Sequence, residues 1–599
     1  MINLLDTLNK LGKLYIEKEQ LNDFEVLVDN KKIGAVVLVE FIEDSNGNIN
    51  YGKVYQEDYD SKNKVKYLYK KGSSSGTDIT PSCLITELPK TFKNKFVKWF
   101  EKNNSENEFF EKIYNVIMDS KDEIFSALDE LIKSIDIKDS NILLSLIIKK
   151  NDEIHYLHDF DDFNEFFIKS CYDKFQGPKK VKGNGVCYLC NQEKEVFGMV
   201  SNSIGFTFST PEKRGNVPGF DIKNQLKLLP ICKDCAIYLN AGKNFVEENL
   251  NFSEFGLRYY VIPNLLFDSE KGFNKIYDVI QLLNSEENMS SSDVIHIENK
   301  LGKIVKRIDD IAEFKFLFYQ ASNNAFDILA YVESVIPSWL NSLYNVQYKI
   351  SEYDFFKEKN LKLIFGDKHE GNFIQLINKN EKNYPCAENN WYKQFLRDFI
   401  NDFSRKLYID TVVNVISNKK LDYSFLMSRF MHKIRSNWRN EENYALKLSV
   451  LKSLMLLILF NEIKIFKGGK NMVSENEEFS IDLILDSPSK KATFLLGVLT
   501  RKLMNIQYKE LGSTPFYTKL WGLSLDEKKI HKLYPMVINK LQEYDAGYMR
   551  ELEEEISKNL AESENNWKLN RDETSYYFVL GFTLPNFDKN EKNEDDLNE

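Results

Sequence analysis

Cysteine is scarce in this sequence and long apolar runs are missing, and each absence excludes a class of protein. Seven cysteines in 599 residues are few and odd in number, which argues against a closed disulfide framework. The most apolar run covers only residues 454–460, whereas a membrane-spanning helix needs about 20 residues. An acid, Asp6, stands where a signal peptide has a basic region. We therefore expect a reduced, cytoplasmic protein without a membrane partner.

A uniformly basic surface is also missing. The chain has 80 Lys and Arg against 90 Asp and Glu, a net charge of -10, so a nucleic-acid-binding surface would have to be a local patch. The remaining composition, 43% hydrophobic and 28% charged, is that of a globular protein. At about 150 residues per domain, the length suggests about four domains.

The common phosphate-binding motifs are absent. The sequence contains no G-x-x-x-x-G-K-[ST] or G-x-G-x-x-G pattern, and G-x-S-x-G occurs only as the serine run Gly72-Ser-Ser-Ser-Gly76. One cluster, formed by His155, His158 and Asp159, resembles part of a metal-dependent nuclease site, because residues at i and i+3 share a helix face. The next histidine is His296, so a second cluster is hard to assemble. A polar helix surface is the alternative interpretation of these residues.

The hydrophobic patterns predict a multidomain α+β protein that is mostly α-helical. We expect an N-terminal α/β domain with a β-rich part, a zinc-finger and basic region, a helical domain with a short β insert, and a C-terminal helical bundle. Their predicted boundaries are 1–170, 171–267, 268–466 and 472–599, respectively.

Within these regions the pattern assigns individual elements. Helices are expected at residues 1–20, mainly at 88–170, and at 270–350 and 388–466. Strands are expected at 34–42, 51–55, 65–69, 254–267 and 361–365, with a turn at Asn46-Gly47.

Four cysteines form two C-x-x-C pairs separated by 41 residues, Cys187 with Cys190 and Cys232 with Cys235. Two such knuckles can supply the four thiolates of a tetrahedral zinc ion. The usual gap between pairs is about 15–20 residues, so this finger would carry an insertion. Four sulfur ligands leave no open coordination position, so we expect structural Zn²⁺. Buried free thiols are the alternative.

The region around the cysteines is locally basic. Residues 170–243 contain eleven Lys or Arg against six Asp or Glu, a net charge of +5. Phe206 and Phe208 are candidates for base stacking, with core packing as the alternative. The polar residues of the inserted loop are of the types that contact bases and phosphates. The candidate DNA-binding residues here are Asn202, Lys213, Arg214, Asn216, Lys223 and Asn224.

Two further segments could contact nucleic acid. A loop with Lys70, Lys71, Ser73 and Ser74 offers ammonium groups and hydroxyls to an RNA phosphate, although an ordinary hairpin loop has the same composition. Lys491, Lys502 and Lys509 are spaced by 11 and 7 residues, which places them on one side of a helix. We predict that they contact DNA; a solvated helix face is the alternative.

Several motifs together resemble a known family, the large subunit of the type I-B CRISPR effector complex, Cascade. The resemblance covers most of the chain, and the cysteine quartet is its most specific part. The other motifs are YLYKKGS at 67–73, Thr80-Pro81, Lys90-Thr-Phe-Lys93 with Trp99, FTFSTPEK at 206–213 and YYFVLGF at 576–582.

This resemblance implies a role in recognition and not in catalysis. Such subunits lie beside the handle of the CRISPR RNA, read a short protospacer-adjacent motif on double-stranded target DNA, help to open the duplex and recruit a separate helicase-nuclease. The implied partners also include the Cascade backbone and handle-binding subunits. A metal-dependent nuclease using His155, His158 and Asp159 is the alternative function.

The resemblance also implies a second product of the same gene. Residues 472–599 resemble the small subunit of these complexes. Codons for Gly468-Gly469 can contain a ribosome-binding sequence shortly before Met472, so we predict an internal start there. A flexible glycine linker between two helical domains is the alternative.

Overall fold

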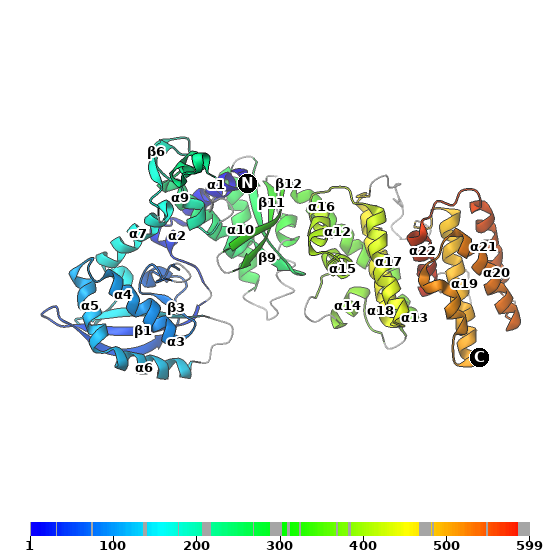
Figure 1. Ribbon diagram of the computed structural model, residues 1–599, viewed down its shortest axis with the longest axis horizontal. Coiled ribbons are helices and arrows are strands. Elements are labelled where there is room, and N and C mark those ends of the chain that lie inside the picture. Colours follow the sequence, from blue (N-terminus) through cyan, green and yellow to red (C-terminus); the bar gives the residue numbers. More distant parts are fainter. Residues whose placement is uncertain are drawn as a thin grey trace. The chain divides into compact units, whose positions relative to one another are not determined.

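The chain divides into two compact units, and most of it lies in helices (Figure 1). The first unit contains Met1–Asn251, Arg258–Lys275 and Lys315–Tyr331, and the second contains Phe252–Leu257, Ile276–Phe314 and Val332–Glu599. The expected multidomain α+β character is confirmed. The computed structural model describes residues 2–31, 33–72, 76–135, 141–177, 179–206, 217–266, 269–287, 302–307, 312–322, 325–366, 369–380, 385–466, 481, 484–546 and 549–584.

A five-stranded sheet forms the centre of the N-terminal part. Its order is β2-β1-β4-β3, and β5 pairs with β4. The hairpin of β1 and β2 closes at the expected turn, where Gly47 has a φ of 78° that favours glycine. Because β1 and β4 are parallel, helices α3–α6 form the crossover between them. The strands are β1 Ile33–Glu43, β2 Ile49–Glu57, β3 Cys83–Ile85, β4 Asn141–Lys150 and β5 Glu153–Tyr156.

Four of the expected elements are wrong. Residues 141–150 form the buried strand β4 where we expected helix, because a central parallel strand is apolar on both faces and shows no period of two. The same ambiguity hid the buried strand β11 within 270–350, where the edge strand β12 was missed as well. Residues 65–67 lie in the 3₁₀ helix Lys64–Tyr67, and residues 68 and 69, which follow it, are not in a strand. Residues 361–365 belong to a helix, which buries Leu361 and Ile364 at a spacing of three.

Two smaller sheets follow. The first has the order β6-β7-β8, and the second has the order β12-β11-β10-β9, which confirms the extended segment expected near 254–267. Their strands are β6 Lys182–Val186, β7 Glu193–Phe197, β8 Ile231–Cys232, β9 Asn251–Glu254, β10 Leu257–Leu265, β11 Ala312–Ser322 and β12 Ala325–Val335.

Helix α1 confirms the helix expected at residues 1–20. It packs along α9 in the first unit. The helices are α1 Ile2–Glu19, α2 Asp23–Leu27, α3 Leu88–Thr91, α4 Lys98–Asn103, α5 Glu108–Asp119, α6 Lys121–Ser134, α7 Asp161–Gln176, α8 Val200–Ser203 and α9 Lys233–Asn249; α10 Ser269–Glu287 follows them.

The second unit is mainly helical, as expected for 388–466. Helix α19 contacts α20, α21 and α22, while α22 also packs against α17 and α18. The helices are α12 Pro337–Ser351, α13 Glu358–Phe365, α14 Phe373–Asn380, α15 Tyr392–Ile400, α16 Arg405–Ile416, α17 Tyr423–Arg439, α18 Asn443–Glu462, α19 Pro488–Leu511, α20 Glu527–Glu543, α21 Arg550–Ser563 and α22 Arg571–Thr583, with the 3₁₀ segment Pro515–Leu523 before α20.

Helix α18 stands out among the described residues because it is both long and apolar. Its 20 residues are long and apolar enough to cross a membrane by length and composition, with a mean hydropathy of 1.5. However, 72% of the apolar window is buried inside the protein, and α18 contacts α12, α15, α17 and α22. These contacts are those of a core helix.

Candidate metal centre

The two cysteine pairs lie on the three-stranded sheet and at the start of the helix that follows it. Cys187 comes directly after β6, and its carbonyl accepts a hydrogen bond from the N–H of Asn191 at 2.9 Å. Asn191 has a φ of 55°, which closes this first knuckle. Cys232 ends β8 and caps α9, so Cys235 lies in the first turn of that helix.

The fold brings all four sulfur atoms together, as the spacing predicted. They lie within 4.8 Å of one another, and the Sγ atoms of Cys190 and Cys232 are 3.8 Å apart. A zinc–sulfur distance of about 2.3 Å implies a tetrahedral edge of about 3.8 Å. The four cysteines therefore fit a zinc ion and would hold it without an open position for substrate.

The surroundings of Cys187 favour the thiolate that a metal requires. A hydrogen bond with the Cys235 thiol outweighs burial and, with backbone N–H groups that include that of Cys232, lowers the pKa of Cys187 to about 4. The Cys232 N–H lies 3.3 Å from the Cys187 sulfur. The same shared proton and burial raise the pKa of Cys235. One thiolate is thus stabilised by the protein before a metal adds its own charge.

Helix α9 connects the cysteines to the rest of the first unit. The side-chain amide of Asn9, on α1, donates to the carbonyl of Cys235 at 3.0 Å. Further along, α1 and α9 meet at Gly12 and Gly242, where a Cβ atom on Gly12 would lie 1.8 Å from the carbonyl O of Tyr238. A metal at the start of α9 would therefore brace a helix that is already held tightly against α1.

Most of the proposed DNA-binding loop falls outside the described residues. This applies to Lys213, Arg214 and Asn216, and to the side chain of Asn202, whose backbone lies in α8. Lys223 is exposed on the 3₁₀ helix Ile222–Lys227. Asn224 is half-buried, and its amide donates to the carbonyl of Pro218 at 2.8 Å. Asn224 therefore shapes the loop, while Lys223 is presented to solvent.

The aromatic residues differ from expectation. Phe206 is only 1% exposed and packs against Phe326, so its predicted stacking role is wrong; Phe208 lies outside the described residues. By contrast, Phe220 is 70% exposed and has a φ of 56°. Sequence analysis missed Phe220, although its position after Pro218-Gly219 at a turn was visible. It lies three residues before Lys223.

Two of the basic residues of this region form ion pairs with acids of the same region. Lys182 pairs with Glu195 at 3.0 Å, and Lys194 pairs with Asp234 at 2.8 Å. All four side chains are at least one-third exposed, so these ion pairs contribute little to stability. Because Glu195 and Asp234 are already counted in the net charge of +5, these pairs leave that charge unchanged and engage only two of the eleven basic side chains.

The loop predicted to bind RNA is only partly described, because Ser73 and Ser74 lie outside. The Lys70 ammonium donates to the Leu27 carbonyl at 2.5 Å and pairs with Asp29 at 3.2 Å. An RNA phosphate would have to compete with these partners for Lys70. Lys71 is exposed, and its backbone N–H donates to Asp29 at 2.9 Å.

The candidate nuclease residues do not converge. Among the described residues, the four cysteines form the only group of three or more His, Cys, Asp or Glu placed to share a metal. The His158 Nδ1 atom is 2.7 Å from the side-chain oxygen of Asn164, and the Asp159 carboxylate accepts the Tyr156 N–H at 2.7 Å. His155 lies on β5 and packs edge-on against Phe160.

The three lysines of α19 lie on one continuous helix, as predicted. Lys509 is exposed, and Lys491 and Lys502 are half-buried. Contact with DNA through them stays a prediction. The predicted start at Met472 and the glycines before it lie outside the described residues.

Comparison with known proteins shows the family of the chain. No curated protein matches it. Domain models of one CRISPR-associated family, TM1802, match three successive segments: the N-terminal domain at residues 4–169, the central domain at 184–335 and the C-terminal domain at 389–596. The central match includes all four cysteines. The chain therefore belongs to the CRISPR-associated protein TM1802 family.

Proposed function

We propose that this protein is the non-catalytic large subunit of a type I-B Cascade complex, and that its zinc-braced region reads a short motif on target DNA. The observation that carries the proposal is the four-cysteine cluster beside a loop that presents Phe220 and Lys223 to solvent. In this role the protein works in the cytoplasm with CRISPR RNA, the backbone and handle-binding subunits, and a small subunit started at Met472. It aids duplex opening and recruits a helicase-nuclease.

Local hydrogen bonds and packing hold the loop that carries Phe220 and Lys223. The Asp221 carboxylate accepts the Lys223 N–H at 3.1 Å and caps the 3₁₀ helix. Within that helix Gln225 is buried, with 2% exposure, and the helix contacts β6 of the cysteine-bearing sheet. A metal that fixes this sheet would therefore also fix the loop, which lowers the entropy lost when DNA is bound.

Phe220 and Lys223 supply different chemistry. An exposed aromatic ring can stack on an unpaired base or wedge between base steps. The Lys223 ammonium suits a phosphate contact, which holds the loop on DNA without reading sequence. Base reading itself is assigned to Asn202, Lys213, Arg214 and Asn216, whose side chains lie outside the described residues.

The test uses the assembled complex with guide RNA and duplex targets that carry or lack the motif. Lys223→Ala should weaken binding to both targets and reduce the salt slope by about 0.9. Phe220→Ala should slow strand opening, followed with a fluorescent base analogue beside the motif. Lys62→Ala, an exposed lysine elsewhere in the first unit, and Leu228→Ala, 44% exposed on the same segment, are the matched controls. Unchanged opening and binding in both variants would reject this assignment.

A further inference from the structure

Helix α22 ends beside the middle of α19, and the described part of the chain stops there. The Lys490 ammonium, near the start of α19, lies 5.1 Å from the centre of the Tyr577 ring. The Arg501 guanidinium, three turns further along α19, lies 5.2 Å from the centre of the Phe582 ring. Phe582 is the second-last residue of α22, and Leu584 is the last described residue. The chain therefore leaves the described region close to Arg501.

Arg501 carries a charge that no carboxylate balances among the described residues. Its side chain is half-buried, and burial lowers its pKa without an opposing acid. Removing a cation from water costs free energy unless the cation is paired. The Phe582 ring covers one side of the guanidinium, but such a contact is worth only about 0.5–2 kcal/mol. Arg501 is therefore placed to gain from an anionic partner.

Lys447, on α18, is a second half-buried cation near Arg501. Burial and the charge of Arg501 together lower the pKa of Lys447. The Lys447 ammonium donates to the Ile364 carbonyl at 2.5 Å and lies 5.9 Å from the centre of the Phe365 ring. Both of these partners are neutral, and no acid in the described ranges pairs with Lys447. The two cations repel each other, and one carboxylate near them would stabilise both.

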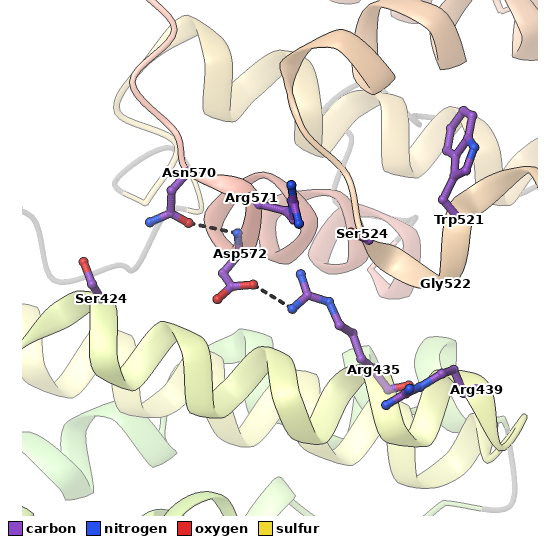
Figure 2. Close-up of a pocket in the computed structure, with 9 residues that line it drawn as sticks. All are labelled: Ser424, Arg435, Arg439, Trp521, Gly522, Ser524, Asn570, Arg571 and Asp572. Carbon is purple, nitrogen blue, oxygen red and sulfur yellow. Dashed lines mark hydrogen bonds and ion pairs between the residues drawn. The ribbon is translucent and has the colours of Figure 1, made fainter.

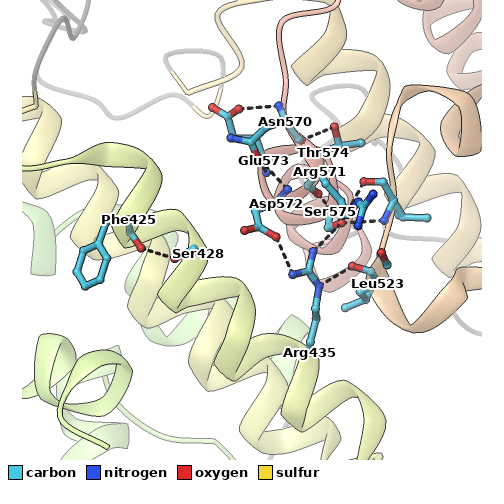
Figure 3. Close-up of polar contacts among 12 residues, drawn as sticks. Phe425, Ser428, Arg435, Leu523, Asn570, Arg571, Asp572, Glu573, Thr574 and Ser575 are labelled. Carbon is cyan, nitrogen blue, oxygen red and sulfur yellow. Dashed lines mark hydrogen bonds and ion pairs between the residues drawn. The ribbon is translucent and has the colours of Figure 1, made fainter. Parts of the chain in front are cut away.

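The other end of α22 shows how this unit pairs an arginine. The Arg435 guanidinium reaches from α17 to Asp572, in the first turn of α22, at 2.6 Å (Figure 2). Its other N–H groups donate to the Leu523 carbonyl at 2.8 Å and to the Ser575 hydroxyl at 3.3 Å (Figure 3). Arg435 thus has the carboxylate that Arg501 lacks within the described part of the chain.

The surface of α19 beyond Arg501 is basic and partly apolar. Residues 501–511 contain three cations against one acid. Tyr508 follows Arg501 by seven residues, which places it on the same side of the helix, and it is 65% exposed. Leu511, at the end of α19, is 54% exposed. An acidic segment that also contains apolar side chains would complement this surface.

We propose that residues 585–599 of the same chain fold back onto this surface, with carboxylates beside Arg501 and Lys447. The segment contains six acids against two lysines, a net charge of -4. It also contains Phe587 and Leu597, whose side chains can cover the exposed apolar part of α19. The charges of the segment and the surface are therefore complementary, and the proposal does not depend on motif reading by the cysteine region.

The place where the segment begins favours it over a separate partner. Asp588 follows Leu584 by four residues, a length of chain that spans up to about 14 Å. The Arg501 guanidinium lies beside Phe582, only two residues before Leu584, so this carboxylate can reach it. A segment tethered so closely has an effective concentration of about millimolar. A nucleic acid or a second copy of the chain would have to displace it.

A zero-length carbodiimide, which joins a carboxylate to a neighbouring amine, tests the contact in the full-length chain. Mass spectrometry should find Lys447 joined to the segment, chiefly at Asp588 or Glu591. Arg501→Gln should lower the yield severalfold, because it removes a charge that holds the segment. Arg550→Gln, at an exposed position on α21, should leave the yield unchanged. Crosslinks from Lys447 only to acids outside 585–599 would overturn the proposal.

A mixture of isotope-labelled and unlabelled chains identifies which copy supplies the segment. Crosslinks within one chain are expected. Hybrid crosslinks between labelled and unlabelled chains would overturn the proposal, because the occupant would then be a second copy.

Thermal unfolding provides a readout that does not depend on crosslinking. In the wild-type background, Arg501→Gln should lower the Tm, because the segment loses its partner. In a variant whose six segment acids are replaced by Asn or Gln, the same change should raise the Tm or leave it unchanged, because it removes an unpaired, half-buried cation. An equal shift in both backgrounds would overturn the proposal and leave the surface to another partner, such as nucleic acid. Failure here would leave the proposed function untouched, because none of these variants alters the cysteine region.

Discussion

Gly497 on α19 and Gly581 on α22 lie against each other's helix backbone. A Cβ atom on Gly497 would be 2.1 Å from the carbonyl O of Phe578, and one on Gly581 would be 1.9 Å from the carbonyl O of Phe494. No side chain fits at either position. The two helices therefore approach as closely as backbone atoms allow, and this contact fixes the position of α22 against α19.

We expect Gly581→Ala to destabilise the second unit. The added methyl would force α19 and α22 apart, and overpacking of this kind typically costs about 1–3 kcal/mol. Gly302→Ala is the control, because its Cβ would meet nothing closer than 3.7 Å. Urea unfolding of both variants, followed by circular dichroism, gives the free energies. Equal stability of Gly581→Ala and wild type would show that the helices separate at no cost.

We expect one zinc ion per chain, held by Cys187, Cys190, Cys232 and Cys235. Elemental analysis of protein purified without chelator should give close to one equivalent, and Cys232→Ser should reduce it. Because metal-binding energy is folding energy at such sites, removal of zinc should speed hydrogen exchange in β6–β8 and the start of α9. Cys386→Ser, at a buried cysteine outside the cluster, should leave the zinc content unchanged. A metal-free wild type with unchanged exchange would contradict the assignment.

Asp29 should make the first unit sensitive to acid. Burial opposes its charge, but the Lys70 ammonium and the Lys71 N–H outweigh burial and lower the pKa of Asp29 below its ordinary value of 3.8. The resulting stabilisation is present above about pH 3.8 and is lost as the pH falls through the lower folded-state pKa. Asp29→Asn should therefore be less stable than wild type at pH 7, and the difference should shrink toward pH 3. Urea unfolding across this range measures it, with the exposed Asp58→Asn as control.

His158→Ala discriminates between the recognition role and a nuclease. We expect the isolated wild-type chain to leave DNA intact with Mg²⁺ or Mn²⁺, and the variant to behave in the same way. The physical reason is that His158 and Asp159 are engaged with Asn164 and Tyr156 and do not gather around a common metal position. Cleavage by the wild type that disappears in His158→Ala would favour the nuclease.

An internal start at Met472 should yield a 128-residue product beside the full chain. Mass spectrometry of the purified complex would detect it, and Met472→Leu or synonymous recoding of Gly468 and Gly469 should abolish it. The structure adds a condition for such a fragment. Helix α22 packs against α17, where Phe582 lies 5.1 Å from Trp438, so the free fragment would expose this face. We expect the fragment to be helical but to need a partner protein that covers this face for full stability. Absence of the 128-residue product from the purified complex would contradict the internal start.

Short-range patterns in the sequence correctly predicted some of the helices and turns of this fold. The apolar spacing in residues 1–20 and 388–466 and the turn at Asn46-Gly47 predicted real elements, because helix period and turn chemistry are local properties. Strand β4 was not predictable in the same way. Its apolar residues are buried on both faces by neighbours distant in sequence, and that burial removes the alternation that identifies a strand.

The sequence by itself predicted the four-cysteine cluster and the CRISPR-associated family, because both depend on which residues the chain contains. Each C-x-x-C pair needs only one tight turn. The tertiary structure alone decided which polar groups are available. It engaged Lys70 with Asp29, buried Phe206, exposed Phe220, and brought Arg435 to Asp572 across 137 residues. The availability of a charged or aromatic side chain depends on which distant segment packs beside it, and a linear pattern does not contain that information.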